Sequence, residues 1–257
     1  MQPGLAPARR ESAMKQASEK ISGFVLAGGR STRLSQDKAL LTWLSEENCK
    51  ENGRTLLDHA IARLRLICDT VSICADRDDL RRPEPFISDV LPDSGPLGGI
   101  VAALGQSQTE WNMFLAVDLP LLPVEVFAAL VARVQLEEQN ARDANPPPQD
   151  RLACILPQLD GLPQPLCGLY RRALAPGLRR ALEQGRRKIM TALQEAIRDS
   201  GTTMESQPRG CSLRIELWDA AGFAASTKTS SSLLASDWFL NINTPEDWQR
   251  AQDLMSA

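Results

Sequence analysis

Apolar residues recur along the first half of the chain in two alternating patterns. Short continuous apolar runs predict strands at residues 21–26, 71–74, 86–88 and 111–117. Between them, apolar residues at a helical period, as at positions 57, 60, 61, 64 and 67, predict helices over 56–68, 96–105 and 123–139. Alternating strands and helices are typical of a parallel sheet with helices on both faces, so we predict an α/β fold.

The second half of the chain has shorter apolar runs and longer polar stretches. We expect strands at 154–156, 165–169 and 238–242, and helices at 171–184 and 188–198. A terminal helix is expected to start at Thr244, Pro245 and Glu246, with threonine as the cap and proline at the first helical position.

Three consecutive prolines within residues 143–150 exclude helix and sheet pairing there, which indicates either a domain boundary or a long loop. We predict a single domain over residues 21–257 after a disordered tail at residues 1–20. Mobile insertions are expected near 143–150 and 200–236, apart from the apolar run 213–218.

Composition and charge exclude several classes of protein. The net charge of −3 provides no overall basic surface for duplex nucleic acid. The longest apolar runs are far shorter than the roughly 20 residues that span a bilayer, and residues 1–20 have no apolar segment typical of a secretory signal. Six cysteines without a CxxC pair, and one histidine, do not indicate a zinc cluster. We therefore expect reduced core cysteines and a cytoplasmic protein that binds neither nucleic acid nor membrane.

The first strand is followed directly by a glycine pair, in the sequence LAGG at residues 26–29. Two glycines let backbone N–H groups approach an anion, and Arg33 and Lys38 would add positive charge beside its oxygens. This combination suits a triphosphate and the charge that develops in phosphoryl transfer. The segment is neither a Walker A loop nor GxGxxG, and a glycine pair after a strand is also a common structural turn.

Two further segments place ligand-binding groups at the ends of predicted elements. The segment DSGPLGGI enters a helix at Pro96, and helix N-termini attract anions, although its glycines would equally suit a capped, tightly packed helix. Asp118 ends the apolar run 111–117, at the end of a strand where ligands gather in open α/β sheets. Its carboxylate suits Mg²⁺, or alternatively the cap of the next helix.

Five segments occur in an order that resembles the molybdenum cofactor guanylyltransferases: LAGGRSTRLSQDKALL, DSGPLGGI, FLAVDLPLLP, QPLCGLYRR and FLNINTPEDW. The resemblance covers roughly residues 21–253. It implies a Rossmann-like nucleotidyltransferase fold, with a mostly parallel central sheet and helices on both faces. It also implies Mg²⁺-dependent transfer of GMP from GTP to molybdopterin, which forms molybdopterin guanine dinucleotide and pyrophosphate. Molybdoenzymes or other cofactor-biosynthesis proteins would be further partners.

The resemblance assigns roles to particular residues. It implies that Leu26, Ala27, Gly28 and Gly29 form the nucleotide loop, that Lys38 contacts phosphate and that Asp89 lies near the nucleotide. Asp118 would bind the metal ion, and Lys38, Arg33 and Asp118 would carry the chemistry. Asn241 and Asn243 match the family's NINTP segment and are candidate substrate ligands, although asparagines beside a strand end also form turns. The phosphate monoester that attacks GTP is largely dianionic near neutral pH, so the reaction needs no histidine base.

Three positions depart from the family pattern. Leu34 and Ser35 stand where the family usually has Met-Gly, and Cys74 where it often has asparagine. Two other functions stay open: a nucleotidyltransferase that uses CTP or a sugar phosphate, and a non-catalytic homologue that binds nucleotide or molybdopterin. The sequence LAGG favours GTP, because related cytidylyltransferases tend to carry a TAAG-like segment. The chain keeps Lys38, Asp89 and Asp118 together, which favours an active enzyme over a non-catalytic homologue.

Overall fold

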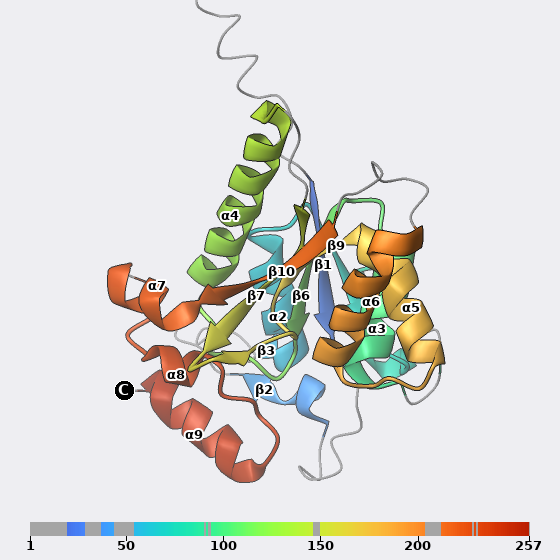
Figure 1. The fold of residues 1–257 in the computed structure, drawn as a ribbon. Coiled ribbons are helices and arrows are strands. Elements are labelled where there is room, and N and C mark those ends of the chain that lie inside the picture. Colours follow the sequence, from blue (N-terminus) through green and yellow to red (C-terminus); the bar gives the residue numbers. More distant parts are fainter. Residues whose placement is uncertain are drawn as a thin grey trace, which may run out of the picture.

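In the part of the chain that the structure describes, eight strands form one central sheet in the order β10-β7-β9-β6-β1-β4-β5, with β8 beside β7 (Figure 1). The computed structural model describes residues 20–28, 37–43, 54–89, 91, 94–145, 150–203, 212–227, 229 and 231–256. The strands are β1 (Ile21–Leu26), β4 (Thr70–Cys74), β5 (Phe86–Ile87), β6 (Trp111–Ala116), β7 (Asp150–Leu159), β8 (Leu162–Pro163), β9 (Leu169–Arg171) and β10 (Ser212–Asp219).

The centre of the sheet is parallel. Strand β1 lies between β4 and β6, and its last residue, Leu26, pairs with Cys74 on one side and Ala116 on the other. All residues of β1 and β6 are buried, as expected for parallel strands covered on both faces. Strand β9 runs antiparallel to both β6 and β7. The predicted α/β fold with a mostly parallel central sheet is confirmed, and the carboxyl ends of β1, β4 and β6 meet at one edge.

Helices cover both faces of the sheet (Figure 1). On one face lie α2 (Leu56–Arg65) and α4 (Val124–Asp143), where the guanidinium of Arg63 packs over the ring of Phe127. On the other face, α5 (Ala175–Glu183) packs against both α3 (Gly95–Gln106) and α6 (Ile189–Thr203). Helix α2 begins with a capping box between Thr55 and Asp58, a local sequence signal for its start.

Short elements complete the described part of the chain. Strands β2 (Thr42–Trp43) and β3 (Arg54–Thr55) form a separate antiparallel pair. The single-turn 3₁₀ helices are η1 (Lys38–Leu40), η3 (Asp78–Leu80) and η4 (Arg172–Leu174). The last helices are α7 (Ala220–Ser226), α8 (Ala235–Trp238) and α9 (Pro245–Ser256). Thr244 caps α9 as predicted, since its Oγ1 accepts from the backbone N–H of Asp247.

Two predicted strands differ from the structure. The strand predicted at 238–242 is wrong, because Trp238 ends helix α8 and residues 239–243 form no regular element. Trp238 and Ile242 are buried there by tertiary packing, so their apolar character does not reflect a strand. The strand predicted at 165–169 starts only at Leu169, and the helix predicted at 171–184 is divided into the end of β9, η4 and α5.

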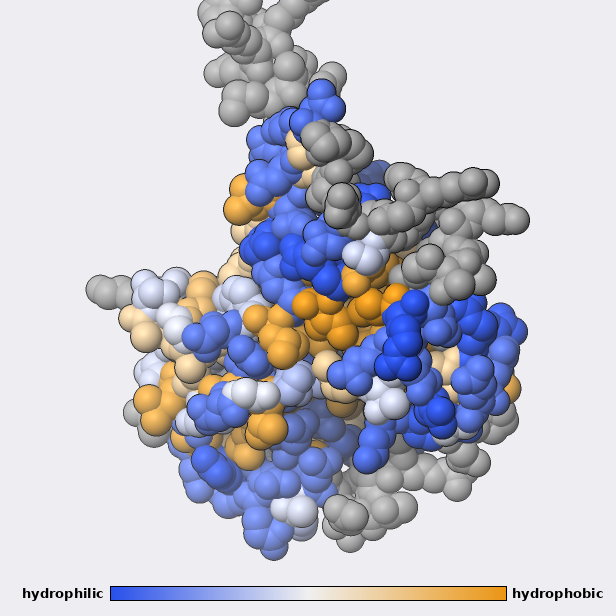
Figure 2. Space-filling view, viewed as in Figure 1, coloured by the Kyte–Doolittle hydropathy of each residue, from blue (hydrophilic) through white to orange (hydrophobic). Residues whose placement is uncertain are grey.

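Strand β10 forms an edge of the sheet, with β7 as its partner strand. Figure 2 shows apolar side chains gathered over β10 near the centre of this face. Within β10, Ile215 is partly buried and Leu217 is 41% exposed. The alternate side chains Arg214 and Glu216 pair with Glu137 and Arg133 of α4 at 2.6 and 2.7 Å. Charged side chains along an edge strand discourage pairing with other chains.

The described residues contain no helix that is long and apolar enough to cross a membrane. Cys68, Cys74, Cys154 and Cys167 are buried with free thiols, in agreement with the expectation of reduced core cysteines. Cys49 and Cys211 lie outside the described residues, as do residues 1–19, 146–149 and 204–210. The predictions of a disordered tail and of mobile insertions therefore stay predictions.

Candidate active site

A pocket of about 680 Å³ lies at the edge where the carboxyl ends of β1, β4 and β6 meet. This is the edge of an open α/β sheet at which ligands bind. Its walls come from the residues after β1, from the ends of β4 and β6, and from the amino end of α3. The lining residues are Leu26, Ala27, Gly28, Lys38, Cys74, Ala75, Asp76, Arg77, Asp89, Ser94, Gly95, Pro96, Gly99, Ala116, Val117, Asp118 and Leu166.

A lysine and an aspartate meet inside this pocket. Lys38 Nζ donates to Asp118 Oδ2 at 2.6 Å, and both side chains are largely buried. Lys38 Nζ also donates to Asn243 Oδ1 at 3.3 Å. These three residues come from distant parts of the sequence, and the fold brings their polar groups to one point. A cation and a carboxylate on adjacent walls suit a ligand that carries both phosphate and a divalent ion.

Asp118 does not cap the helix that follows it. Helix α4 begins at Val124, its cap residue is Pro123, and no side chain accepts a hydrogen bond there. The carbonyl of Asp118 accepts from Ile242 N at 3.0 Å, which fixes the backbone at the end of β6. Among the described residues, the buried Oδ1 of Asp118 has no hydrogen-bond partner. An unpaired buried carboxylate oxygen is costly, so it fits a cation that arrives with the substrate.

The amino end of α3 packs closely against the end of β1. Gly95 has a φ of +61°, which favours glycine, and a Cβ on Gly98 would lie 2.4 Å from Ser94 Cβ. A Cβ on Gly99 would lie 3.2 Å from Leu26 Cδ2. Among the described residues, no side chain caps this helix, and Ser94 Oγ donates to the carbonyl of Leu91. The glycines thus serve tight packing, and the amino end of the helix also lines the pocket.

Asp89 and Asp76 form an acidic corner of the pocket. Asp76 Oδ1 accepts from the backbone N–H of Asp89 at 2.8 Å. Burial, and secondarily the charge of Asp76, raises the pKa of Asp89 to about 6. A carboxylate whose ionised form is destabilised in the free protein is typical of functional sites.

The Asp89→Asn variant is expected to be more stable than wild type at about pH 7.5 without ligand. The fold raises the pKa of Asp89 from 3.8 to about 6, so ionisation lowers stability as the pH rises through this window. Asparagine does not ionise, and because Asp89 is only half-buried the gain is about 1 kcal/mol. Urea unfolding at several pH values measures it, and the gain should fall away towards about pH 4. A gain independent of pH would contradict this explanation.

The structure places most of the predicted site residues together. Six of them line the pocket: Leu26, Ala27, Gly28, Lys38, Asp89 and Asp118. Asn243 contacts Lys38, whereas Asn241 Nδ2 donates to the carbonyl of Phe239 in a local turn and does not line the pocket. Gly29 and Arg33, with the departures at Leu34 and Ser35, lie outside the described residues.

Asp76 and Arg77 line the pocket just beyond the end of β4 but were not predicted as site residues. Their position close behind a predicted strand was the available signal, as it was for Asp118. Cys74, at the end of the same strand, is buried, and burial raises the pKa of its thiol well above its ordinary value. A neutral thiol cannot offer the donor and acceptor that an asparagine amide would provide here.

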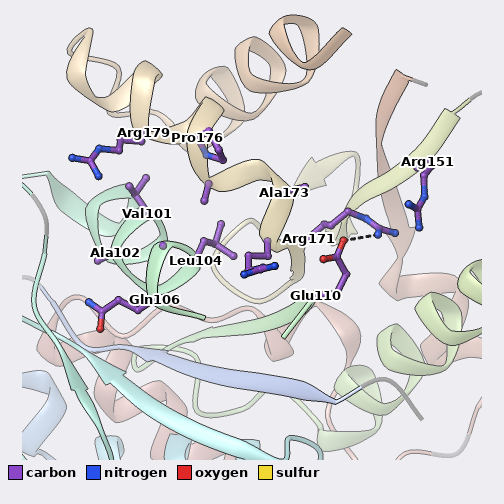
Figure 3. A pocket seen from close by; sticks show the side chains of 13 residues that line it. Val101, Ala102, Leu104, Gln106, Glu110, Arg151, Arg171, Ala173, Pro176 and Arg179 are labelled. Atoms are coloured by element: carbon purple, nitrogen blue, oxygen red, sulfur yellow. Dashed lines mark hydrogen bonds and ion pairs between the residues drawn. The ribbon is translucent and has the colours of Figure 1, made fainter. Parts of the chain in front are cut away.

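A second cavity, of about 820 Å³, lies at the opposite end of the sheet (Figure 3). Glu110 and Arg151, at the amino ends of β6 and β7, are among its walls. Its arginines mostly pair with nearby carboxylates: Arg171 with Glu110 at 2.7 Å and with Glu138, Arg151 with Glu138 at 3.1 Å, and Arg179 with Glu183 at 3.0 Å. Because three of its four lining arginines are paired with carboxylates and the cavity lies away from the carboxyl ends of β1, β4 and β6, the smaller pocket is the better active-site candidate.

The fold is of the Rossmann-like type found in nucleotidyltransferases, and the pocket lies at the edge of the sheet where such folds bind ligands. A family model described as MobA-like NTP transferase domain matches residues 23–197. The chain therefore belongs to the MobA-like NTP transferase family.

Individual relatives agree with this assignment. A probable molybdenum cofactor guanylyltransferase from Synechococcus elongatus is 30% identical over 240 residues, which cover 90% of this chain and 98% of that protein. The molybdenum cofactor guanylyltransferase of Serratia proteamaculans is 33% identical over 183 residues, covering 69% of this chain and 81% of that protein. The crystal structure of molybdopterin-guanine dinucleotide biosynthesis protein A from Archaeoglobus fulgidus is similar with a TM-score of 0.63 and 22% identity, covering 91% and 98% of the two chains.

Proposed function

We propose that this nucleotidyltransferase is a molybdenum cofactor guanylyltransferase, which transfers GMP from GTP to molybdopterin and releases pyrophosphate. The main structural support is the meeting of Lys38 and Asp118 in a pocket that the loop after β1 and the amino end of α3 also line. Relatives with this printed activity are matched over nearly their whole length. The product would be molybdopterin guanine dinucleotide, with molybdoenzymes as its users.

In the proposed reaction, the terminal phosphate of molybdopterin attacks the α-phosphorus of GTP. A P–O bond forms to the attacking oxygen as the bond to pyrophosphate breaks, in line with general phosphoryl-transfer geometry. Lys38 would stabilise negative charge on the phosphates, together with backbone N–H groups of the loop after β1. Arg33, outside the described residues, would supply a second cation. Asn243 and Asn241 stay candidate ligands of molybdopterin, and Asn243 also orients Lys38.

No side chain has to act as a general base in this scheme. The attacking phosphate has a second pKa of about 6 and is largely dianionic near neutral pH. His59, the only histidine, lies in helix α2, and its ring is bonded to the carbonyl of Pro120 at 3.1 Å. Burial, with the positive charge of Arg63, lowers the pKa of His59 to about 4. A buried neutral histidine bonded to the backbone is a structural group and not an acid–base catalyst.

Mg²⁺ fits the groups that the pocket offers. Asp118 provides a hard carboxylate ligand with a buried unpaired oxygen. Mg²⁺ usually binds one or two carboxylates and completes its shell with water and substrate phosphates. Among the described residues, no group of three or more His, Cys, Asp or Glu side chains could form a closed metal cluster, which accords with an ion shared with the nucleotide. When bound, the ion would act as a Lewis acid towards phosphate oxygens.

We also propose a cytoplasmic location, because thiols that remain free in a protein core are typical of reducing compartments. GTP is the proposed nucleotide on the basis of LAGG at residues 26–29 and of the family.

GTP is expected to be used in preference to CTP, ATP and UTP. The test is to incubate the purified protein with molybdopterin, Mg²⁺ and each nucleoside triphosphate in turn, and to identify the dinucleotide product by mass. Reactions without molybdopterin, or with a chelator, provide the controls. Comparable turnover with CTP would overturn the assignment of GTP, and the absence of any dinucleotide would overturn the proposed function.

A further inference from the structure

We infer that Arg77 is a positioning residue for the transfer reaction, because its ion pair with Asp37 holds Lys38 where it acts on the phosphates. This inference rests on the proposed function and extends it to an arginine to which the motifs assign no role. Arg77 lies just beyond the end of β4, and Asp37 comes directly before η1. The ion pair thus connects two segments that are distant in the sequence.

The two oxygens of Asp37 have separate partners. Oδ2 pairs with Arg77 Nη2. Oδ1 accepts from the backbone N–H of Ala39 at 2.9 Å, which caps η1. Lys38 is the first residue of η1, so the cap determines where the lysine side chain starts. Arg77 therefore acts on Lys38 through the carboxylate of Asp37.

The turn that carries Lys38 is anchored at both of its ends. Its internal bonds run from Leu40 N to the carbonyl of Asp37 and from Leu41 N to that of Lys38, at 3.0 and 3.1 Å. Its far end is tied to α2, because Leu56 N donates to the carbonyl of Leu41 at 2.9 Å. The Arg77–Asp37 pair fixes the near end. A single 3₁₀ turn is too short to hold its geometry without such anchors.

Charge gives Arg77 a second effect on Lys38. Asp37 and Lys38 are adjacent, so an unpaired Asp37 carboxylate would attract the lysine ammonium away from Asp118. Arg77 balances the charge of Asp37, with a further contact from its Nη2 to Asp79 Oδ2 at 3.2 Å. The ammonium then stays on Asp118 Oδ2 at 2.6 Å, on the wall of the pocket where the phosphates are proposed to bind.

The competing explanation is a direct contact between Arg77 and the phosphates of the nucleotide, since Arg77 itself lines the pocket and a guanidinium binds phosphate well. The two explanations differ in their predictions for Asp37. If Arg77 works through Asp37, removing either partner slows transfer, and removing Arg77, which also leaves the Asp37 charge unbalanced, slows it at least as much. If Arg77 binds the nucleotide directly, removing the charge of Asp37 leaves Arg77 available and has little effect on GTP affinity.

The test compares Arg77→Met with Asp37→Asn, which removes the charge but keeps an amide oxygen to cap η1. Both are expected to lower kcat for dinucleotide formation by about tenfold, with a smaller change in the KM for GTP, because small displacements of a catalytic group are costly. Arg77→Lys, which keeps the charge, should recover part of the rate. The matched control is Arg81→Met, which removes an exposed pair with Asp78 at 2.7 Å in the same segment, and it should retain the wild-type kcat.

The decisive measurement repeats Arg77→Met in the Lys38→Ala background. If Arg77 acts through Lys38, adding Arg77→Met to the Lys38→Ala variant should lower kcat by less than about twofold, since the effects of residues that act as a unit are not additive. A full tenfold loss in that background, or a normal kcat in Asp37→Asn, would overturn the inference. A wild-type protein that forms no dinucleotide would instead overturn the proposed function. Melting temperatures of all variants identify any loss that comes from unfolding.

Discussion

Replacing Asp118 with asparagine is expected to lower the rate of GMP transfer by about a hundredfold or more while the protein still folds. The amide keeps the shape of the side chain but removes the charge that binds a hard cation. It also removes the ion pair with Lys38 Nζ at 2.6 Å, so the lysine loses its orientation in the pocket. Excess Mg²⁺ should restore only part of the rate, because an amide oxygen is a weaker ligand. Turnover and melting temperature across a Mg²⁺ titration measure both effects.

A second aspartate provides the control for this substitution. Asp219 caps α7 through Oδ1, which accepts from Ala221 N at 3.1 Å, and it does not line the pocket. Asparagine caps a helix about as well as aspartate, so Asp219→Asn should leave both rate and stability near wild type. The same unaltered rate in Asp118→Asn would remove Asp118 from the active site.

The Lys38→Ala variant is expected to bind GTP more weakly and to transfer GMP about a hundredfold more slowly, because a charge-assisted contact to phosphate is lost. In the absence of nucleotide, by contrast, the variant should bind Mg²⁺ more tightly than wild type. Asp118 loses the ammonium that neutralises Oδ2, so its carboxylate attracts a divalent cation more strongly. Calorimetric titration with Mg²⁺ and with GTP, beside steady-state rates, separates the two effects.

Lys188→Ala supplies the comparison, since Lys188 is exposed and lies before α6, outside the pocket. It should match wild type in rate and in both affinities. If GTP affinity and rate are also unchanged in Lys38→Ala, Lys38 is only a pocket-wall lysine without a role in transfer. If Mg²⁺ affinity falls instead of rising, the ammonium of Lys38 does not compete with the cation at Asp118.

Local patterns were sufficient to predict the central elements of the fold. The buried strands β1 and β6 and the partly buried strand β4 are predominantly apolar in the sequence, and α2 shows a helical period and a capping box. These signals depend on residues close together in the chain, which is why they predict elements well. Placing Asp118 at the end of an apolar strand was enough to predict its position at the carboxyl edge of the sheet.

Prediction failed where burial came from tertiary packing. Residues 238–242 are mostly apolar because Trp238 and Ile242 enter the core from a short helix and an irregular segment. Apolar residues that follow no period do not distinguish a buried strand from a buried loop. The edge strand β10 was not predicted, although Arg214 and Glu216 alternate with apolar residues, a pattern typical of a half-buried strand.

By itself, the sequence determined the α/β class, the family resemblance and six of the residues that line the pocket. Only the tertiary structure decided which side chains meet: Lys38 with Asp118, 80 positions away, and with Asn243, 205 positions away. It also excluded Asp118 as a helix cap and joined Arg77 to Asp37. The physical reason is that periodicity indicates which face of an element is buried, whereas contacts between elements depend on strand order and on side-chain packing across the whole sheet.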